Sequence, residues 1–225
     1  MSLVQVKNLA YAYHKGNKIF EGVSFDVKAG QFWGILGRNG AGKTSLIDLI
    51  LGLKTPVHGH ISVCDEDPRI RDATKPNEIV VLSQDISLKS VISIQDFLEF
   101  NAIFYPRYSK QIEKELLTYF NVDPSALIGA LSTGQQKKVQ VVAGLAADTK
   151  VIIIDEITAV LDPETRFLFF KKLQEFNRER GKTILLATNI SEDLQGRVTN
   201  ILYINDGKAE EIDPATINQL FNVIV

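Results

Sequence analysis

The 225-residue sequence contains one cysteine, Cys64, and lacks any apolar run of about 18 residues. A single cysteine excludes a disulfide within the chain, and the apolar segments are too short to span a bilayer as helices. The segment HISVCDE is typical of a strand, so we interpret Cys64 as a small buried hydrophobe. The first residues, MSLVQVKNLAYAY, lack the pattern of a secretory signal. We therefore expect a soluble, cytoplasmic chain.

An excess of charge of one sign is also absent. The chain has 25 Lys and Arg against 27 Asp and Glu, so its formal net charge is −2. The basic residues are scattered along the sequence, which argues against a nucleic acid partner. Hydrophobic residues make up 45% of the chain and charged residues 23%. These are ordinary values for a folded domain, and the length suffices to bury a sizeable core.

Apolar periodicity predicts an α/β fold. Two N-terminal segments alternate apolar and polar residues, as antiparallel strands with one solvated face do: VQVKNLAYAY and KIFEGVSFDVKAG. Later strands read as short apolar runs: QFWGIL, VIIID, TILLAT and NILYIND. Helices are expected between or after them: KTSLIDLILGL ending at Gly52, residues 163–180, a short helix after Thr188, and residues 214–221. This alternation predicts a mostly parallel sheet with helices on both faces.

A helical subdomain is expected inside this α/β core. Residues 93–121 predict two helices broken near Pro106, each with a charged and an apolar face. We see no repeat, low-complexity tract or linker, so we expect a single domain over residues 1–225. Its helical subdomain spans about 85–130, and its α/β core, which includes the antiparallel part, spans about 1–83 and 131–225.

A phosphate-binding loop is predicted by GRNGAGKT, residues 37–44, which fits GxxxxGK[ST] and lies between a predicted strand and a predicted helix. Glycines allow backbone N–H groups to surround phosphate oxygens, and the following helix directs its positive end at the same anion. Lys43 would add a charge near the outer phosphates, and Thr44 would offer its hydroxyl to Mg²⁺. A glycine-rich turn that binds nothing is the alternative, which the flanking strand and helix disfavour. The expected nucleotide-binding residues are Gly37, Arg38, Asn39, Gly40, Ala41, Gly42, Lys43, Thr44 and Ser45.

Two carboxylates follow the predicted strand VIIID. Asp155 is expected to orient the Mg²⁺ shell through water, and Glu156 is expected to act as the general base on the attacking water. The alternative is that both carboxylates only stabilise the start of the next helix.

A second helix start is predicted at LSTGQQKKV, residues 131–139. Ser132 and Gln135 have the spacing of a capping box, while Thr133 and Gly134 leave backbone N–H groups open to an anion. A single nucleotide rarely needs two such sites. An ordinary capped helix is the alternative.

These motifs resemble, in order and over essentially the whole chain, the ATP-binding subunit of an ATP-binding cassette (ABC) transporter. GRNGAGKT is similar to the family's Walker A motif, VIIIDE to Walker B, LSTGQ to the signature, AVLDP to the D-loop and LSQD to the Q-loop. The resemblance implies a P-loop ATPase that uses ATP and Mg²⁺. It also implies that Gln84 serves Mg²⁺ and the attacking water, that Asp162 is the D-loop aspartate and that Tyr13 stacks on adenine.

The resemblance implies partners as well. In this family two domains dimerise head to tail, and each ATP lies between one subunit's Walker A loop and the signature of the other. We expect a homodimer or heterodimer docked on a separate membrane permease of export type, at the inner face of the membrane. Residues near 85–108 would form the coupling surface with Phe104, Tyr105 and Tyr108, unless these aromatics pack inside the helical subdomain.

Three positions depart from the family pattern. Asn189 stands where a histidine usually contacts the γ-phosphate, Thr133 replaces a glycine and Ile157 replaces a proline. Asparagine still donates a hydrogen bond but does not exchange a proton near pH 7, so we expect weakened hydrolysis. On composition alone, Asn189 is equally typical of a turn.

Other functions remain open at this point. One is a regulatory half with little turnover, paired with an active sister subunit. Another is a soluble ABC ATPase of DNA repair or translation, although this chain has neither a second cassette nor a long coiled-coil insertion. A GTPase is disfavoured because no NKxD motif is present.

Overall fold

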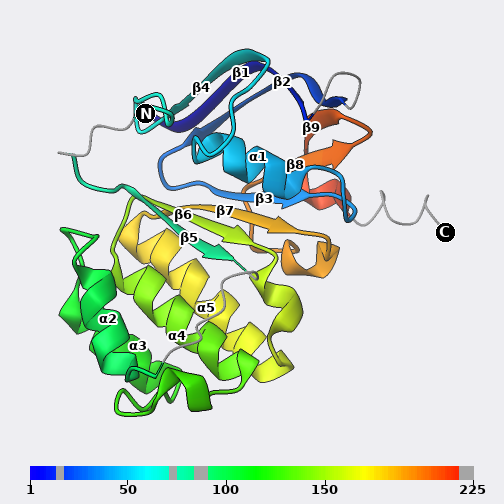
Figure 1. The fold of residues 1–225 in the computed structure, drawn as a ribbon. Helices are drawn as coiled ribbons and strands as arrows, with labels where there is room; N and C mark the ends of the chain where they lie inside the picture. The colour runs from blue at the N-terminus through cyan, green and yellow to red at the C-terminus, as the bar shows by residue number, and fades with distance from the viewer. Residues whose placement is uncertain (14–17, 71–74, 84–90, 218–225) are drawn as a thin grey trace.

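The larger of two β-sheets forms the centre of the computed structural model, which describes residues 1–217 except 14–17, 71–74 and 84–90. Its strand order is β5-β6-β7-β3-β8-β9 (Figure 1). The strands are β3 (Phe32–Leu36), β5 (Ile79–Ser83), β6 (Val151–Asp155), β7 (Thr183–Thr188), β8 (Asn200–Asn205) and β9 (Lys208–Ile212). Neighbouring strands are parallel, except that β9 runs antiparallel to β8. The predicted mostly parallel sheet is confirmed.

The central strands β3, β6 and β7 are buried along their whole length. Their sequences are continuous apolar runs because both faces of the sheet are covered, which leaves no solvated face for alternating polar residues. Burial on both faces makes this part of the sheet a rigid support for the loops that follow its strands.

A smaller antiparallel sheet and one helix cover the first face. This sheet has the order β2-β1-β4 and consists of β1 (Ser2–Ala12), β2 (Lys18–Lys28) and β4 (His58–Val63). Helix α1 (Lys43–Ile50) lies between the two sheets in Figure 1. Side chains from both sheets and from α1 form one hydrophobic cluster, which contains Trp33, Phe20 and Leu46. The predicted N-terminal antiparallel part is confirmed.

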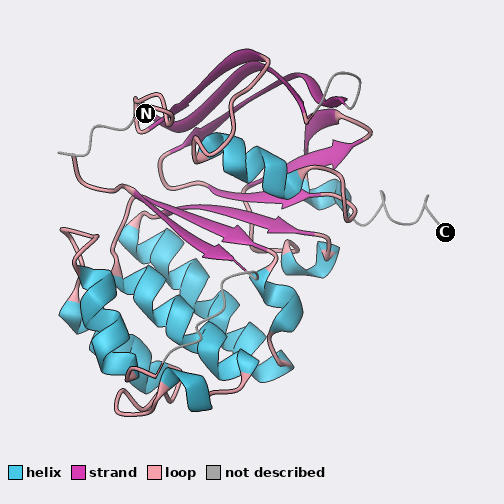
Figure 2. Cartoon of the chain, in the orientation of Figure 1, coloured by secondary structure: helices cyan, strands magenta, loops and turns pink. Residues whose placement is uncertain are grey.

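Helices cover the opposite face of the larger sheet (Figure 2). Helices α4 (Thr133–Ala146) and α5 (Pro163–Arg180) lie next to the sheet, and α2 (Ile94–Ala102) and α3 (Lys110–Tyr119) pack outside them. Apolar residues of all four helices share one cluster with the sheet. The described residues also contain the short 3₁₀ turns η1 (Ile128–Ala130), η2 (Ile157–Val160), η3 (Ser191–Asp193) and η4 (Pro214–Thr216).

Several elements differ from the sequence prediction. The sequence pattern does not predict β5, or β9, whose charged sequence KAEEI is typical of an exposed edge. The helix predicted after Thr188 is only the turn η3. The helix predicted at 214–221 begins as a 3₁₀ turn, and its last residues lie outside the described part of the chain. In the part that the structure describes, no helix is long and apolar enough to cross a membrane.

The chain turns sharply at Gly52, which follows Leu51, the C-cap residue of α1. Its φ is +74°, and a Cβ there would lie 2.2 Å from the backbone oxygen of Pro68. We predict that Gly52→Ala lowers the free energy of unfolding by roughly 2 to 5 kcal/mol, because left-handed strain adds to overpacking against backbone. Urea unfolding followed by circular dichroism measures this loss.

The matched control is Gly181→Ala, at a φ of +63° with no atom within 4 Å of the added Cβ. This variant should lose only about 1 to 2 kcal/mol, the cost of the backbone conformation. Equal losses at the two positions would show that the contact with Pro68 is unimportant.

Candidate nucleotide site

The loop between β3 and α1 depends on the absence of a side chain at Gly42. This residue caps α1 with a φ of +106°, and a Cβ would lie 2.8 Å from Cγ2 of Ile19 and 2.9 Å from Cζ of Phe20. Only glycine combines this backbone conformation with this packing. The loop therefore lies close against β2 while the N-terminal end of α1, with its free N–H groups, remains open to an anion.

A cavity of about 300 Å³ lies in front of this loop. Its walls come from the loop, α1, the N-terminal sheet and the end of β6. It is lined by Tyr13, Ile19, Asn39, Gly40, Gly42, Lys43, Thr44, Ser45 and Glu156. All of these residues except Ile19 are predicted site residues, so the fold brings most of the predicted nucleotide site together.

Lys43 is folded back onto its own loop. Its Nζ donates to the backbone oxygens of Gly37, at 2.9 Å, and Arg38, at 3.1 Å. It also lies 2.9 Å from Oε1 of Glu156. Only 3% of Lys43 is exposed, and a buried ammonium is tolerated when it is paired and hydrogen-bonded. A phosphate entering the cavity would compete with these partners for the same cation.

Asp155 ends strand β6 with one oxygen that has no partner. Its Oδ1 is buried and accepts no hydrogen bond from any described residue. Burial raises the pKa of Asp155, although a hydrogen bond from Thr44 opposes this shift. An acceptor held dry beside a threonine hydroxyl fits Mg²⁺, which prefers oxygen ligands and takes few of them from protein. Thr44 and Asp155 therefore suit a magnesium ion that also binds phosphate.

Glu156 follows directly in an unusual backbone conformation. Its φ is +52°, and its N–H donates to the backbone oxygen of Ala187 on β7, at 3.1 Å. This conformation directs the carboxylate to the cavity side, where it meets Lys43. A partly exposed carboxylate at that point can accept a proton from water. Non-glycine residues with positive φ are often found at functional sites.

Asn189 lies directly after β7 and contacts the phosphate-binding loop. Its Nδ2 donates to Oδ1 of Asn39 at 2.9 Å, although the two residues are 150 positions apart in the sequence. Asn189 is exposed and is not among the residues that line the cavity. The contact places a neutral amide at the rim of the site.

Tyr13 also lines the cavity and is 47% exposed. Its hydroxyl lies 2.6 Å from Oγ of Ser45 and accepts from Nζ of Lys54 at 3.0 Å. The bond from Lys54 lowers the pKa of Tyr13, with a smaller contribution from Ser45. Lys54 in turn pairs with Asp48 on α1, at 2.7 Å. These contacts tie the aromatic ring to α1, so it forms a fixed wall of the cavity.

The signature and D-loop residues start two other helices. Ser132 Oγ accepts from the N–H of Gln135, and Gln135 Oε1 accepts from the N–H of Ser132, so the predicted capping box is present. Asp162 caps α5 by accepting a hydrogen bond from the N–H of Thr165. This bond lowers the pKa of Asp162. Neither Thr133 nor Gly134 lines the cavity. Within the single chain, the helix start that is predicted to bind a second anion therefore lies apart from the cavity.

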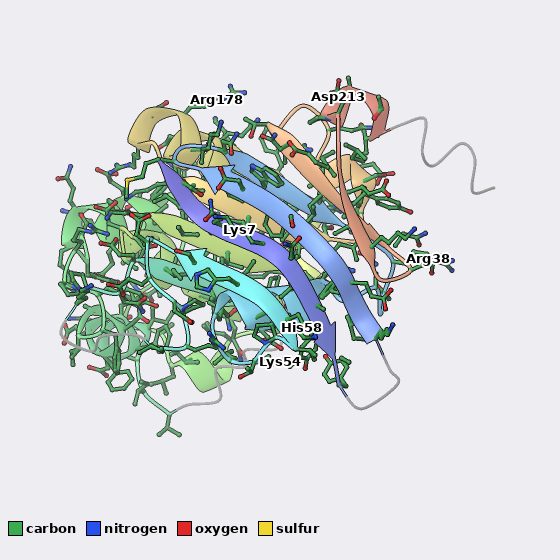
Figure 3. All side chains as sticks on the ribbon, turned by 90° about the horizontal axis from the view of Figure 1, so that it is seen from above. Lys7, Arg38, Lys54, His58, Arg178 and Asp213 are labelled. Carbon is green, nitrogen blue, oxygen red and sulfur yellow. The ribbon has the colours of Figure 1, made fainter. Side chains whose placement is uncertain are left out.

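The remaining predicted residues contribute differently. Arg38 and Ala41 shape the loop by a turn in which the N–H of Ala41 donates to the oxygen of Arg38. The Arg38 side chain is exposed and extends away from the molecule in Figure 3. Gln84 lies outside the described residues. Sequence reasoning missed Ile19 and Lys54, since neither belongs to a motif and only packing places them at the site.

Comparison with protein families gives a match over residues 20–159 to the model described as ABC transporter. The "Nod factor export ATP-binding protein I" of Burkholderia orbicola is 30% identical over 215 residues, 91% of this chain and 68% of its own length. The protein of that name from Rhizobium meliloti is 31% identical over 84% of this chain and 58% of its own length. The chain thus spans about two thirds of the length of these curated relatives.

Solved structures support the same fold. A structure titled "Structure of ATP binding subunit of ABC transporter" superposes with a TM-score of 0.86, at 24% identity, and covers 99% of this chain and 94% of its own. A dimeric ATP-binding cassette bound to ADP and Pi has a TM-score of 0.81, at 23% identity, over 94% of this chain and 98% of its own. At these identities the likeness establishes the fold alone.

The unpartnered oxygen of Asp155 leads to a prediction about stability. Asp155→Asn should raise the free energy of unfolding by about 1 kcal/mol at neutral pH in EDTA, because a neutral amide is less costly to bury than this carboxylate. The raised pKa of Asp155 leads to the same expectation, because it means that the folded protein disfavours the ionised carboxylate. Urea unfolding measures the difference.

Glu179→Gln is the matched control, because Glu179 is exposed on α5 and should change stability by less than about 0.5 kcal/mol. Addition of Mg²⁺ together with a non-hydrolysable ATP analogue should stabilise the wild type more than Asp155→Asn. Equal stabilisation would remove Asp155 from the metal site.

Proposed function

Because the chain belongs to the ABC transporter family of ATP-binding proteins, we propose that it is the subunit that hydrolyses ATP to drive export through a separate membrane permease. The observation that supports hydrolysis best is the pairing of Lys43 with Glu156 in the cavity, at 2.9 Å. It places a cation able to hold phosphate and a carboxylate able to accept a proton from water in the same cavity, two parts that phosphoryl transfer to water uses.

Phosphate binding is the role proposed for the loop from Gly37 to Ser45. The N–H groups at the start of α1 and the Nζ of Lys43 would hold the anion, and the incoming phosphate would replace the loop oxygens that Lys43 now contacts. Thr44 and Asp155 would hold Mg²⁺, with Gln84 as a further ligand. The ion would neutralise phosphate charge. Tyr13 would stack on the adenine, which suits its partly exposed ring.

Glu156 is proposed as the general base. Its pairing with Lys43 occupies the carboxylate while no phosphate is present. Phosphate would draw Lys43 away and leave the carboxylate available to the attacking water. Asn189 would donate to the γ-phosphate from its place beside Asn39.

Dimerisation is proposed to complete the site. The N-terminal end of α4 is partly or fully exposed at Ser132, Thr133, Gly134 and Gln135, and it lies apart from this chain's own cavity. These residues and Asp162 would contact the nucleotide of a second ABC subunit, in a homodimer or a heterodimer. The solved dimeric cassette of the same fold is consistent with such a pairing.

The permease is proposed to dock near the helical subdomain, at the inner face of the membrane. Phe100, Ile103 and Phe104 are more than half exposed on and after α2. Tyr105 and Tyr108 pack against the core instead, so of the three expected aromatics Phe104 remains the candidate. Relatives named for Nod factor export support the export direction. We also propose that the chain is a single ABC ATPase domain whose helical subdomain spans about 85–130.

A regulatory subunit with low turnover is a second candidate. Asn189 at the usual histidine position favours it. Loss of one donor at developing charge costs about 3 kcal/mol, roughly a hundredfold in rate, and partial replacement by asparagine should cost less. Thr133 adds bulk where the partner's phosphate would bind.

The steady-state ATPase rate of the pure protein tests the proposal, with Glu156→Gln as the comparison. We expect Mg²⁺-dependent turnover in the wild type and at least a hundredfold less in Glu156→Gln, because the general base is lost. The variant should still bind ATP and accumulate as a dimer on size-exclusion chromatography. Wild-type turnover in Glu156→Gln would refute its role. Turnover that occurs only after addition of a sister subunit would favour the regulatory candidate.

Asn189→His should increase turnover, by up to about tenfold, because an imidazole reaches further and can carry charge to the γ-phosphate. The matched control is Asn200→His, at a distant strand position whose asparagine also makes side-chain hydrogen bonds. An unchanged or lower rate in Asn189→His would mean that the site is adapted to asparagine.

A further inference from the structure

We infer that Asp193, which belongs to none of the family motifs identified in the sequence, is a positioning residue that holds Glu156 and Asn189 in place for hydrolysis. This inference rests on the proposed ATPase function and concerns a residue behind the site. Asp193 lies at the end of η3, and only 2% of it is exposed. A buried carboxylate is costly unless charge and hydrogen bonds compensate it.

Four hydrogen bonds satisfy this carboxylate. Its Oδ2 accepts from Oγ1 of Thr158 at 2.7 Å and from Oγ1 of Thr188 at 3.3 Å. Its Oδ1 accepts from both Nε, at 2.9 Å, and Nη2 of Arg166. Thr158 and Thr188 are each only 1% exposed, so their hydroxyls have little access to water as an alternative partner.

The three partners come from three separate segments, each close to a proposed site residue. Thr158 is two residues after Glu156, on η2. Thr188 directly precedes Asn189, at the end of β7. Arg166 is four residues after Asp162, and its N–H donates to the oxygen of Asp162 in the first turn of α5. One side chain therefore joins the general-base segment, the γ-phosphate segment and the D-loop.

The negative charge determines the direction of the hydrogen bonds. A carboxylate only accepts, so both threonine hydroxyls must donate to it. The oxygen of Thr188 is then free to accept from the N–H of Ile190, at 3.0 Å. Asn189 is thus held from both sides, by the hydroxyl of Thr188 and by the backbone N–H that follows it. An uncharged group at position 193 would not impose this direction.

None of the four hydrogen bonds of Asp193 goes to the phosphate-binding loop, which meets the positioned residues through Asn39 and Lys43. Lys43 contacts Gly37, Arg38 and Glu156. Disturbing Asp193 should therefore displace the groups that act on water and the γ-phosphate while leaving the binding of nucleotide to the loop intact. This distinction separates a positioning role from a general effect on folding.

Asp193→Asn tests the inference. The amide keeps the size of the side chain but must turn an N–H group either toward Arg166 or toward the threonines. We expect kcat to fall about 10- to 100-fold, the range typical of residues that orient a site. The KM for ATP and the Kd of a fluorescent ATP analogue should stay within threefold of wild type. A kcat within threefold of wild type would overturn the inference.

The matched control is Asp148→Asn. Asp148 is also paired with a cation, Lys182, at 2.6 Å, but it precedes β6 and so lies at the opposite end of that strand from Glu156. Its kcat should equal that of wild type. An equal fall in both variants would indicate a general effect of losing an ion pair, and would overturn the inference.

A double-mutant cycle with Asn189→Ala shows whether Asp193 acts through the site. Because Asp193 is proposed to act partly through Asn189, Asp193→Asn should lower single-turnover hydrolysis by a smaller factor when Asn189 is already alanine, and the part exerted through Glu156 should remain. Glu156→Gln gives the background rate. An undiminished effect in the Asn189→Ala background would overturn the inference.

Thr158→Val is the second variant, in case Asp193→Asn does not fold. It removes one donor to Asp193 without a change in size and should lower kcat about threefold or more, with the Kd of the analogue unchanged. An unchanged kcat would count against the inference.

The wild-type rate tests the proposed function, and the ratio of variant to wild type tests Asp193. A wild type without turnover overturns both, whereas an active wild type with an equally active variant overturns only the second.

Discussion

The site depends on the register of three adjacent parallel strands. Leu36 of β3 lies opposite Thr188 of β7, and Ala187 of β7 lies opposite Asp155 of β6. The carboxyl ends of these strands therefore meet at one edge of the sheet, and the chain leaves each strand toward the same space. Open α/β sheets commonly bind ligands at such an edge. The phosphate-binding loop, Glu156 and Asn189 are neighbours for this reason, although long stretches of sequence separate them.

The charged residues at this edge are better suited to binding a ligand than to stabilising the fold alone. Lys43 is compensated by two backbone oxygens and by Glu156, so the loop keeps its shape in the protein alone. Asp155 retains an oxygen for which the described chain provides no partner. Asp193 behind them is satisfied by four bonds. Asp193, whose oxygens are satisfied, thus differs from Asp155, whose environment suits a metal ion.

The sequence predicts the fold well where local chemistry decides it. The glycine loop, the capping box at Ser132 and the helix that begins at Pro163 all form where their patterns indicate. Prediction fails for the strands β5 and β9, which take their conformation from pairing with distant strands. It also fails for Lys54, whose place beside Tyr13 follows from the packing of the N-terminal sheet on α1.

By itself, the sequence determined which residue types occupy the motifs, the strand, loop and helix around Lys43, and the substitution of asparagine for histidine at position 189. These are local properties, since spacing and backbone freedom act over a few residues. Only the tertiary structure decided that Asn189 contacts Asn39, that Lys43 pairs with Glu156, and that Asp193 joins three segments. Such contacts follow from strand order and packing, which bring together residues that no short pattern connects.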